Sequence, residues 1–339
     1  MATRGRCRLV IRPIMGTENM KSAVWGVIVL CSLNVPTGAF DLQGHRGARG
    51  HKPENTLPAF QQAIEFGVTT LETDLALTRD GHLVLSHEPL LNPDLTRDET
   101  GAWLEAPGPA IRTLTLQDVQ RFDVGRLKPG TRYAAQWPAQ SPVDGTRMPT
   151  LAQLFALGTA SNPRLRYNIE TKLSPDKPAE TADPDTFATA VVEAIRTAAL
   201  ADRVTVQSFD WRTLAAVKRL APEIATVCLT IDTPNASTVK PRDGRASPWL
   251  AGLDPAAFGG SIPKTVQAMG CSTWSPFWRN IAAAAVAEAQ ALGLKVIPWT
   301  INEPADMAAV IDMKVDGLIS DYPERARAVL AAKGIALAP

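Results

Sequence analysis

The chain has 339 residues, of which 45% are hydrophobic and 20% charged, so it holds enough apolar material for a large core. Lys and Arg together number 35 against 34 Asp and Glu, and the net charge of +1 excludes a broadly basic nucleic-acid-binding protein. No apolar run reaches the roughly 20 residues that a transmembrane helix needs. We therefore predict a globular protein without a stable membrane span in the mature chain.

The first 39 residues differ in composition from the rest. Basic residues precede a short apolar run over 23–31, and the small residues of 36–39 follow it. This order is typical of a secretory signal peptide, so we predict cleavage near Ala39 and a secreted or periplasmic protein. The basic part is long for such a peptide, and we infer that Met20 is the true start. A buried N-terminal helix or a retained anchor is the alternative.

Of the four cysteines, Cys7 and Cys31 fall in the predicted leader. The other two, Cys228 and Cys271, would meet an oxidising compartment after export, which permits one disulfide. Two free buried thiols are an equal alternative from the sequence.

From residue 40 onward, short apolar segments alternate with segments of helical periodicity. The strands predicted in chain order are 40–44, 69–77, 83–86, 165–171, 204–208, 224–230, 271–275, 294–300 and 315–320. The predicted helices are 57–66, 151–157, 211–220, 281–292 and 303–313, with Thr56, Thr150, Asp210, Asn280 and Asn302 at their starts. Repeated alternation of this kind predicts a parallel sheet, because each parallel crossover needs a helix.

About eight strands fit a closed (β/α)8 barrel, the TIM-barrel fold of the α/β class, and an open doubly wound sheet is the alternative. No Gly-rich nucleotide fingerprint follows any predicted strand, which favours the barrel. Residues 88–149 are polar and rich in proline, and they predict an inserted loop or subdomain after the second strand. The stretch 232–255 is a second long loop, and such loops commonly shape a substrate site.

Carboxylates gather on two of the predicted strands. Glu72 and Asp74 are two residues apart, so they project to the same face of a strand. Two carboxylates on a buried face repel each other unless a cation lies between them, and oxygen ligands suit Mg²⁺ or Ca²⁺. A pair on an exposed face is the alternative. Glu170 and Lys172 repeat the spacing on another strand, as a third carboxylate and a cation or as a surface ion pair.

Two of the four histidines, His45 and His87, end predicted strands close to these carboxylates in the sequence. A histidine has a pKa near neutrality, so a pair of them can divide general acid and general base work. Arg46 offers a planar, permanent cation for a phosphate oxygen, and a salt bridge at the barrel end is the alternative.

These segments together resemble the glycerophosphodiester phosphodiesterase family. The shared motifs are His45-Arg46-Gly47, Glu54-Asn55-Thr56, Ala59-Phe60, Glu72-x-Asp74, Thr78-Arg79-Asp80-Gly81, His87, Ile169-Glu170-Thr171-Lys172, Gln207-Ser208-Phe209, Pro298-Trp299-Thr300-Ile301-Asn302 and Val315-Asp316-Gly317-Leu318-Ile319-Ser320-Asp321. They run in order through nearly the whole chain after the leader, 40–339. Glu88 stands where the family usually carries Asp, which keeps the charge.

The resemblance implies a TIM barrel that hydrolyses glycerophosphodiesters to sn-glycerol 3-phosphate and an alcohol with one divalent cation, Mg²⁺ or Ca²⁺. By position, the implied roles are metal ligands for Glu72, Asp74 and Glu170, acid/base catalysis for His45 and His87, phosphate binding for Arg46 and Lys172, and site lining for Glu54, Phe209 and Trp299. The insertion 88–149 corresponds to the additional subdomain of the family. The expected partner is a small-molecule substrate, with no nucleic acid.

In the implied reaction, His45 activates the nucleophile and His87 protonates the leaving alkoxide, although exchanged roles fit the sequence equally. The nucleophile is water or the 2-hydroxyl group of the glycerol, and head-group preference and oligomeric state stay open. The alternatives are a related TIM-barrel phospholipase acting on intact or lyso lipids, a glycosidase with paired carboxylates, and a catalytically dead phosphate-ester binding protein.

Overall fold

A computed structural model describes residues 39–338, so the predicted leader lies outside the described residues. The strands are β1 Asp41–Gly44, β2 Thr70–Leu77, β3 Leu83–Leu85, β4 Arg166–Thr171, β5 Val204–Ser208, β6 Ala225–Thr230, β7 Thr273–Pro276, β8 Lys295–Val296 and β9 Gly317–Ser320. The α-helices are α1 Leu57–Glu65, α2 Leu116–Val119, α3 Leu151–Ser161, α4 Pro184–Thr197, α5 Trp211–Leu220, α6 Ile262–Met269, α7 Ala283–Ala291, α8 Pro304–Asp312 and α9 Pro323–Ala332. Within this range, none of the helices has the length and apolar character that crossing a bilayer requires.

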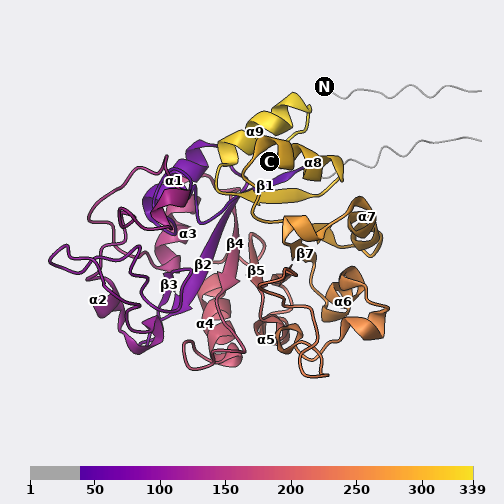
Figure 1. Ribbon diagram of the computed structural model, residues 1–339, viewed down its shortest axis with the longest axis horizontal. Helices are drawn as coiled ribbons and strands as arrows, with labels where there is room; N and C mark the ends of the chain where they lie inside the picture. Colours follow the sequence, from indigo (N-terminus) through magenta and orange to yellow (C-terminus); the bar gives the residue numbers. More distant parts are fainter. Residues whose placement is uncertain (1–38, 339) are drawn as a thin grey trace, which may run out of the picture. The chain divides into compact units, whose positions relative to one another are not determined.

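Eight of these strands form a nearly closed parallel barrel, in the order β8-β7-β6-β5-β4-β2-β1-β9. Main-chain bonds also join the two ends of this order: the Ile319 amide donates to Pro298, and the Ile301 amide donates to Ile319, each at 3.0 Å. The helices that connect the strands lie around the outside of the sheet (Figure 1). The predicted TIM barrel is confirmed, and the open doubly wound sheet is wrong.

Two predicted strands differ from the structure. The strand predicted over 83–86 forms β3, which pairs antiparallel with β2 and is no part of the barrel order. A short turn joins β2 to β3, and short turns connect antiparallel neighbours. The strand predicted over 294–300 narrows to β8, because Pro298 has no amide hydrogen to donate to a ladder.

The helix starts at Thr56, Thr150 and Asp210 are confirmed, since each side chain accepts a hydrogen bond from an amide in the first helical turn. The two predicted asparagine caps are wrong. Asn280 bonds the main chain of Asp232 instead, and α7 follows Ala282. Asn302 donates to Asp321, and α8 follows Glu303. In both cases the side-chain oxygen that could cap the helix accepts instead from a distant main-chain amide, that of Asp232 for Asn280 and that of Asp321 for Asn302.

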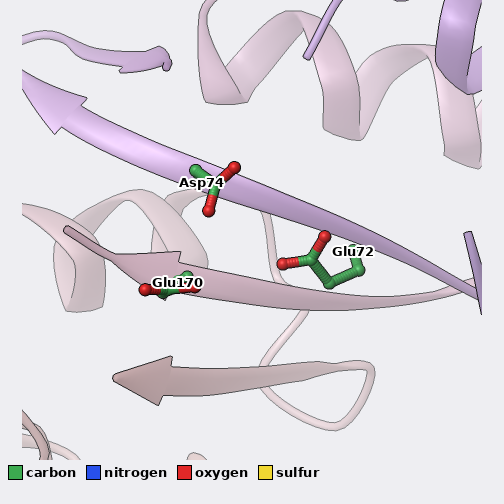
Figure 2. A group of neighbouring side chains, drawn as sticks. All are labelled: Glu72, Asp74 and Glu170. Atoms are coloured by element: carbon green, nitrogen blue, oxygen red, sulfur yellow. The ribbon is translucent and has the colours of Figure 1, made fainter. Parts of the chain in front are cut away.

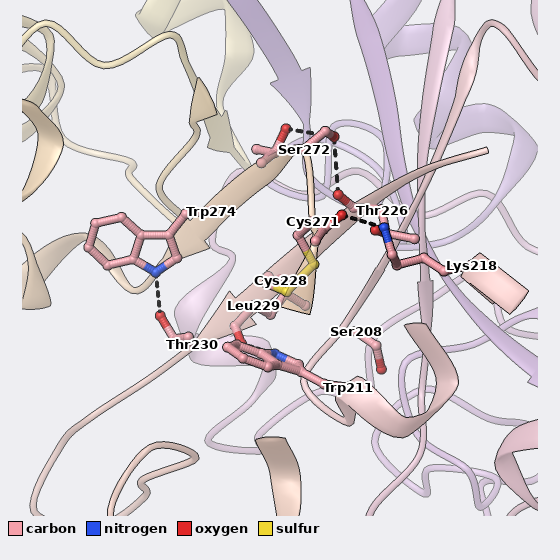
Figure 3. The surroundings of a disulfide bond; sticks show 12 residues. Ser208, Trp211, Lys218, Thr226, Cys228, Leu229, Thr230, Cys271, Ser272 and Trp274 are labelled. Atoms are coloured by element: carbon pink, nitrogen blue, oxygen red, sulfur yellow. Dashed lines mark hydrogen bonds between the residues drawn. A yellow bond between two sulfur atoms is a disulfide. The ribbon is translucent and has the colours of Figure 1, made fainter. Parts of the chain in front are cut away.

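Large side chains fill the layer between the barrel strands and the outer helices, and Tyr167, Phe187 and Trp211 are fully buried there. In the same layer Cys228 of β6 is disulfide-bonded to Cys271, with a Cα–Cα distance of 6.0 Å (Figure 3). This pairing resolves the choice that the sequence left open, in favour of the disulfide over two free thiols.

The segment 88–149 lies between β3 and α3 and contains only short helices: α2 and the 3₁₀ turns Ile111–Thr113 and Ala134–Gln136. It has a small apolar core of its own, in which Leu91, Ile111 and Val119 are buried against Ala76 and Val84 from the barrel side.

Candidate active site

The predicted site residues gather at the carboxyl ends of the parallel strands, the face where TIM-barrel active sites lie. A cavity of about 180 Å³ opens there. Its lining includes His45, Arg46, Glu72, His87, Glu170, Lys172, Phe209 and Trp299. The other two predicted residues, Glu54 and Asp74, form ion pairs with the Arg46 guanidinium, with N–O distances of 2.8 Å and 3.1 Å. The structure thus brings all ten predicted residues together.

Three buried carboxylates form the polar centre of the cavity. Glu72 and Asp74 come from β2 and Glu170 from the adjacent strand β4, where it pairs in register with Asp74 (Figure 2). Each offers an oxygen that lies within 4.8 Å of the other two. The exposed-face alternative for Glu72 and Asp74 is wrong, because both residues are only 1% exposed.

The pKa values of the triad reflect the repulsion between its three buried carboxylates. Burial, Asp74 and Glu170 raise the pKa of Glu72 well above its ordinary value. Burial raises the pKa of Glu170 to about 7, with Asp74 adding to it and Lys172 opposing it. Asp74 Oδ1 is buried, and no group of residues 39–338 donates a hydrogen bond to it. A hard divalent cation suits three carboxylate oxygens so placed, and the triad fits one.

Other polar groups hold the triad in place. The Gln207 side-chain amide donates to one oxygen of Glu72 at 2.7 Å, and the main-chain amide of Arg46 donates to the other at 2.9 Å. Asn55 donates to Asp74 at 2.9 Å. Since these donors fix the orientation of Glu72 and Asp74, the oxygens of both carboxylates are preorganised for a cation.

The turn after β1 explains how Arg46 can use both its amide and its side chain here. Arg46 and Asn55 both adopt the left-handed conformation, with φ of 50° and 54°, a strained state that clusters at functional sites. Gly47 follows with φ of 87°, and a Cβ at this position would lie 2.6 Å from the Ala59 backbone. Only glycine permits this approach of the turn to α1.

The two cations stay charged although they are buried. Burial alone would lower the pKa of Arg46, but Glu54 and Asp74 raise it well above its ordinary value. The Lys172 ammonium lies 2.8 Å from Glu170 and 3.7 Å from Asp74, and these carboxylates likewise raise its pKa against the effect of burial. Arg46 and Lys172 therefore present positive charge to the cavity.

Each site histidine has its Nδ1 on a carboxylate. His45 Nδ1 lies 2.7 Å from Asp321, and His87 Nδ1 lies 2.8 Å from Glu88. Burial lowers the pKa of His45 to about 4 despite Asp321, and burial with Arg46 and Lys172 lowers the pKa of His87. Both rings are neutral at pH 7, so each can take up a proton.

Comparison with known proteins identifies this arrangement. A model of the glycerophosphoryl diester phosphodiesterase family matches residues 45–325. The chain belongs to this family. A glycerophosphodiester phosphodiesterase of Caldanaerobacter subterraneus is 29% identical over 83% of this chain and 93% of its own length. The crystal structure of a putative glycerophosphoryl diester phosphodiesterase from Silicibacter pomeroyi shares 31% identity at a TM-score of 0.78, over 88% of this chain and 96% of that chain.

A solved structure of lower sequence identity holds a ligand. The phosphodiesterase of Oleispira antarctica, solved with the product sn-glycerol-3-phosphate, is 21% identical to this chain and shares the fold at a TM-score of 0.63, over 86% of this chain and 97% of that chain. The resemblance that the sequence motifs carry is thus confirmed at the level of the family.

Sequence reasoning assigned no role to three residues that this family member places around His45, although it listed Asp321 in a shared motif. Asp321 binds the His45 ring, Arg49 binds Asp321 at 2.8 Å, and Tyr133 of the insertion contacts Arg49 and Glu54. The acid that directly follows the last barrel strand was a usable signal for Asp321. Nothing local in 88–149 marks Tyr133, because its role depends on where the insertion folds.

Aromatic rings form one wall of the cavity mouth in this phosphodiesterase fold. Phe209 and Trp299 meet edge to face at 5.3 Å, and Phe277 lies 5.6 Å from Trp299. Lys172 lies 5.9 Å from the Phe209 ring centre. The wall is apolar beside a charged floor, which suits a ligand with one polar and one carbon-rich end.

Proposed function

We propose that this chain hydrolyses glycerophosphodiesters to sn-glycerol 3-phosphate and an alcohol, using Mg²⁺ or Ca²⁺ held by Glu72, Asp74 and Glu170. Membership of the family supports the reaction class. The observation that carries the proposal is the buried carboxylate triad with two permanent cations beside it in one cavity. Hydrolysis of a phosphodiester with the help of a metal requires carboxylates to hold the metal ion and positively charged side chains nearby to bind the phosphate, and this cavity has both.

A divalent cation bound at the triad would supply Lewis-acid stabilisation of charge on a non-bridging phosphate oxygen. Arg46 and Lys172 donate to the remaining oxygens. Their carboxylate partners Glu54 and Glu170 fix them in place beforehand, so little reorganisation accompanies binding. Phe209 and Trp299 cover the carbon-rich side of the ligand.

His45 acts as the general base, with Nε2 accepting the proton of the nucleophile. Its Nδ1 contact with a buried aspartate and its low pKa support this assignment, because a base must be neutral when the substrate arrives. His87 donates a proton to the leaving alkoxide. An anionic phosphate in the cavity raises the pKa of His87 toward the protonated form that an acid needs.

The first test is release of sn-glycerol 3-phosphate from glycerophosphocholine by the purified mature protein, with EDTA, Mg²⁺ or Ca²⁺. We expect release only with a divalent cation, and ³¹P spectra taken during turnover show a cyclic phosphate if the glycerol 2-hydroxyl is the nucleophile. Release in EDTA, or no release with either cation, would reject the proposal. His45→Ala and His87→Ala should each abolish turnover, whereas His82→Ala, a histidine in the turn after β2, should not.

We also propose that this reaction takes place outside the cytoplasm, because the first 39 residues have the composition of a secretory leader. The Cys228–Cys271 disulfide accords with an oxidising compartment. N-terminal sequencing of exported protein checks this, and a mature chain that retains Arg12 would contradict it.

A further inference from the structure

The insertion 88–149 contacts Arg49, whose guanidinium lies 3.1 Å from His45 Nδ1. The Arg49 guanidinium carbon lies 4.2 Å from the ring centre of Trp137, and its Nη1 donates to the Tyr133 hydroxyl at 3.3 Å. The Gln140 side chain donates to the main-chain carbonyl of Arg49 at 2.8 Å. Trp137 and Arg49 are each 8% exposed, so this stack is shielded from water.

Arg49 in turn fixes Asp321. Its Nε and Nη2 donate to the two carboxylate oxygens at 2.8 Å and 3.2 Å, and Asn302 adds a third donor at 2.8 Å. A bidentate arginine–carboxylate ion pair of this kind sets the orientation of the carboxylate as well as stabilising its charge. Asp321 is fully buried, and it is held with Oδ1 toward the His45 ring.

One arrangement of hydrogens satisfies the shorter of the two contacts of His45 Nδ1, the one with Asp321 at 2.7 Å. Arg49 and His45 lower the pKa of Asp321 against the effect of burial, so the carboxylate is ionised and only accepts. His45 Nδ1 therefore carries the hydrogen, and its 3.1 Å contact with Arg49 is between two donors. His45 Nε2 is left with its lone pair on the cavity side, 3.9 Å from Glu72.

We propose that the insertion sets the orientation and tautomer of His45 through successive contacts from Trp137 to Arg49 to Asp321. The proposal rests on the proposed role of His45 as general base. Asp321, Arg49 and Trp137 are then positioning residues, and Trp137 acts although it does not line the cavity. Small misplacements of a reacting group matter, because an error of about 1 Å can cost about a hundredfold in rate.

The tautomer can be observed without turnover. The chain has only four histidines, so ¹⁵N spectra of the mature protein should resolve His45, assigned by its loss in His45→Gln. We expect the Nδ1–H tautomer in the wild type and a mixture of tautomers in Asp321→Asn. A wild-type His45 in the Nε2–H form would overturn the proposal.

Kinetics then test whether the contacts act in series. Asp321→Asn should lower kcat at least about a hundredfold, since the wrong tautomer is costly in a carboxylate–histidine pair. Trp137→Leu should lower kcat about fivefold, with KM and the cation-induced rise in Tm unchanged. The double variant should be no slower than Asp321→Asn alone, because both changes act through one carboxylate. Losses that multiply would overturn the proposal.

Two matched variants separate positioning from general damage. Trp103→Leu removes another insertion tryptophan that stacks on an arginine, Arg97 at 5.5 Å, and should leave kcat unchanged. Trp137→Phe keeps an aromatic face over Arg49 and should keep kcat within about twofold of the wild type. If Trp137→Leu does not fold, Arg49→Lys, which loses the bidentate contact, should lower kcat at least about tenfold. An inactive wild type with His45 in the expected tautomer would refute the proposed function and leave the positioning intact.

Discussion

The disulfide joins Cys228 of β6 to Cys271, two residues before β7, and its contribution to stability can be calculated from the length of the loop that it closes. Cys228 and Cys271 are 43 residues apart, and cross-linking a loop of that length removes conformational entropy from the unfolded chain. The loop-closure relation gives about 4 kcal/mol at 25 °C. The double variant Cys228→Ala/Cys271→Ala, which leaves no polar atom in the buried site, should lose about this much stability.

Calorimetry of the mature protein is the appropriate assay. Unfolding entropy of about 2 cal/mol/K per residue converts the loss to a fall in Tm of about 6 °C for a domain of this size. Because Leu229 lines the cavity and its neighbour Cys228 points to the outer layer, kcat at 25 °C should stay within about twofold. An unchanged Tm in the double variant, or in the wild type scanned with reductant, would refute the reasoning.

Three further predictions concern charge in the cavity. Glu72→Gln should weaken Mg²⁺ or Ca²⁺ binding at least about tenfold by calorimetric titration, whereas the exposed control Glu193→Gln should not; equal affinities would contradict the ligand assignment. Arg46→Lys should lower kcat/KM at least about tenfold, because a lysine does not reproduce the planar contacts to Glu54 and Asp74, and full activity would reject them. Glu54 and Asp321 have lowered pKa values, so their ionised forms stabilise the fold above pH 4.5, and this contribution is lost as the pH falls below it. In urea unfolding, the free energy of unfolding of Asp321→Asn should therefore fall less steeply with decreasing pH than that of the wild type. Identical pH dependence would count against the ion pairs of Asp321.

The sequence was most informative where the alternation of side chains along a strand and the known position of active sites in a barrel point to the same residues. The alternation of side chains placed Glu72 and Asp74 on one face of β2, and the parallel barrel turned that face inward. The strand-end rule put His45 and Lys172 beside them. These predictions needed no knowledge of distant contacts, and the geometry confirms that the residues meet.

Where a residue's partner lies far away in the chain, the same rules failed. Asn302 has the local signature of a helix cap, but its side-chain amide donates to Asp321. The residue therefore supports the carboxylate beside His45 and does not cap α8. Helices were expected between the strands, but no bounds were predicted for α4, α6 and α9, although each has proline in its first turn, a signal that their sequences do carry. Tyr133 and Arg49 meet across 84 residues, a contact set only by the folded insertion.

The charges around the cavity give an independent reason for a divalent cation. Among residues 39–338, the buried or nearly buried charged side chains around the cavity are the carboxylates Glu54, Glu72, Asp74, Glu170 and Asp321 and the cations Arg46, Arg49 and Lys172. Full ionisation leaves an excess of two negative charges, which a single divalent ion neutralises. Uncompensated buried charge is costly, and without a cation the excess is relieved by protonation, as the raised pKa values of Glu72 and Glu170 indicate. Cation binding should therefore release protons from these two carboxylates, while Arg46 and Lys172 keep their charge for the phosphate.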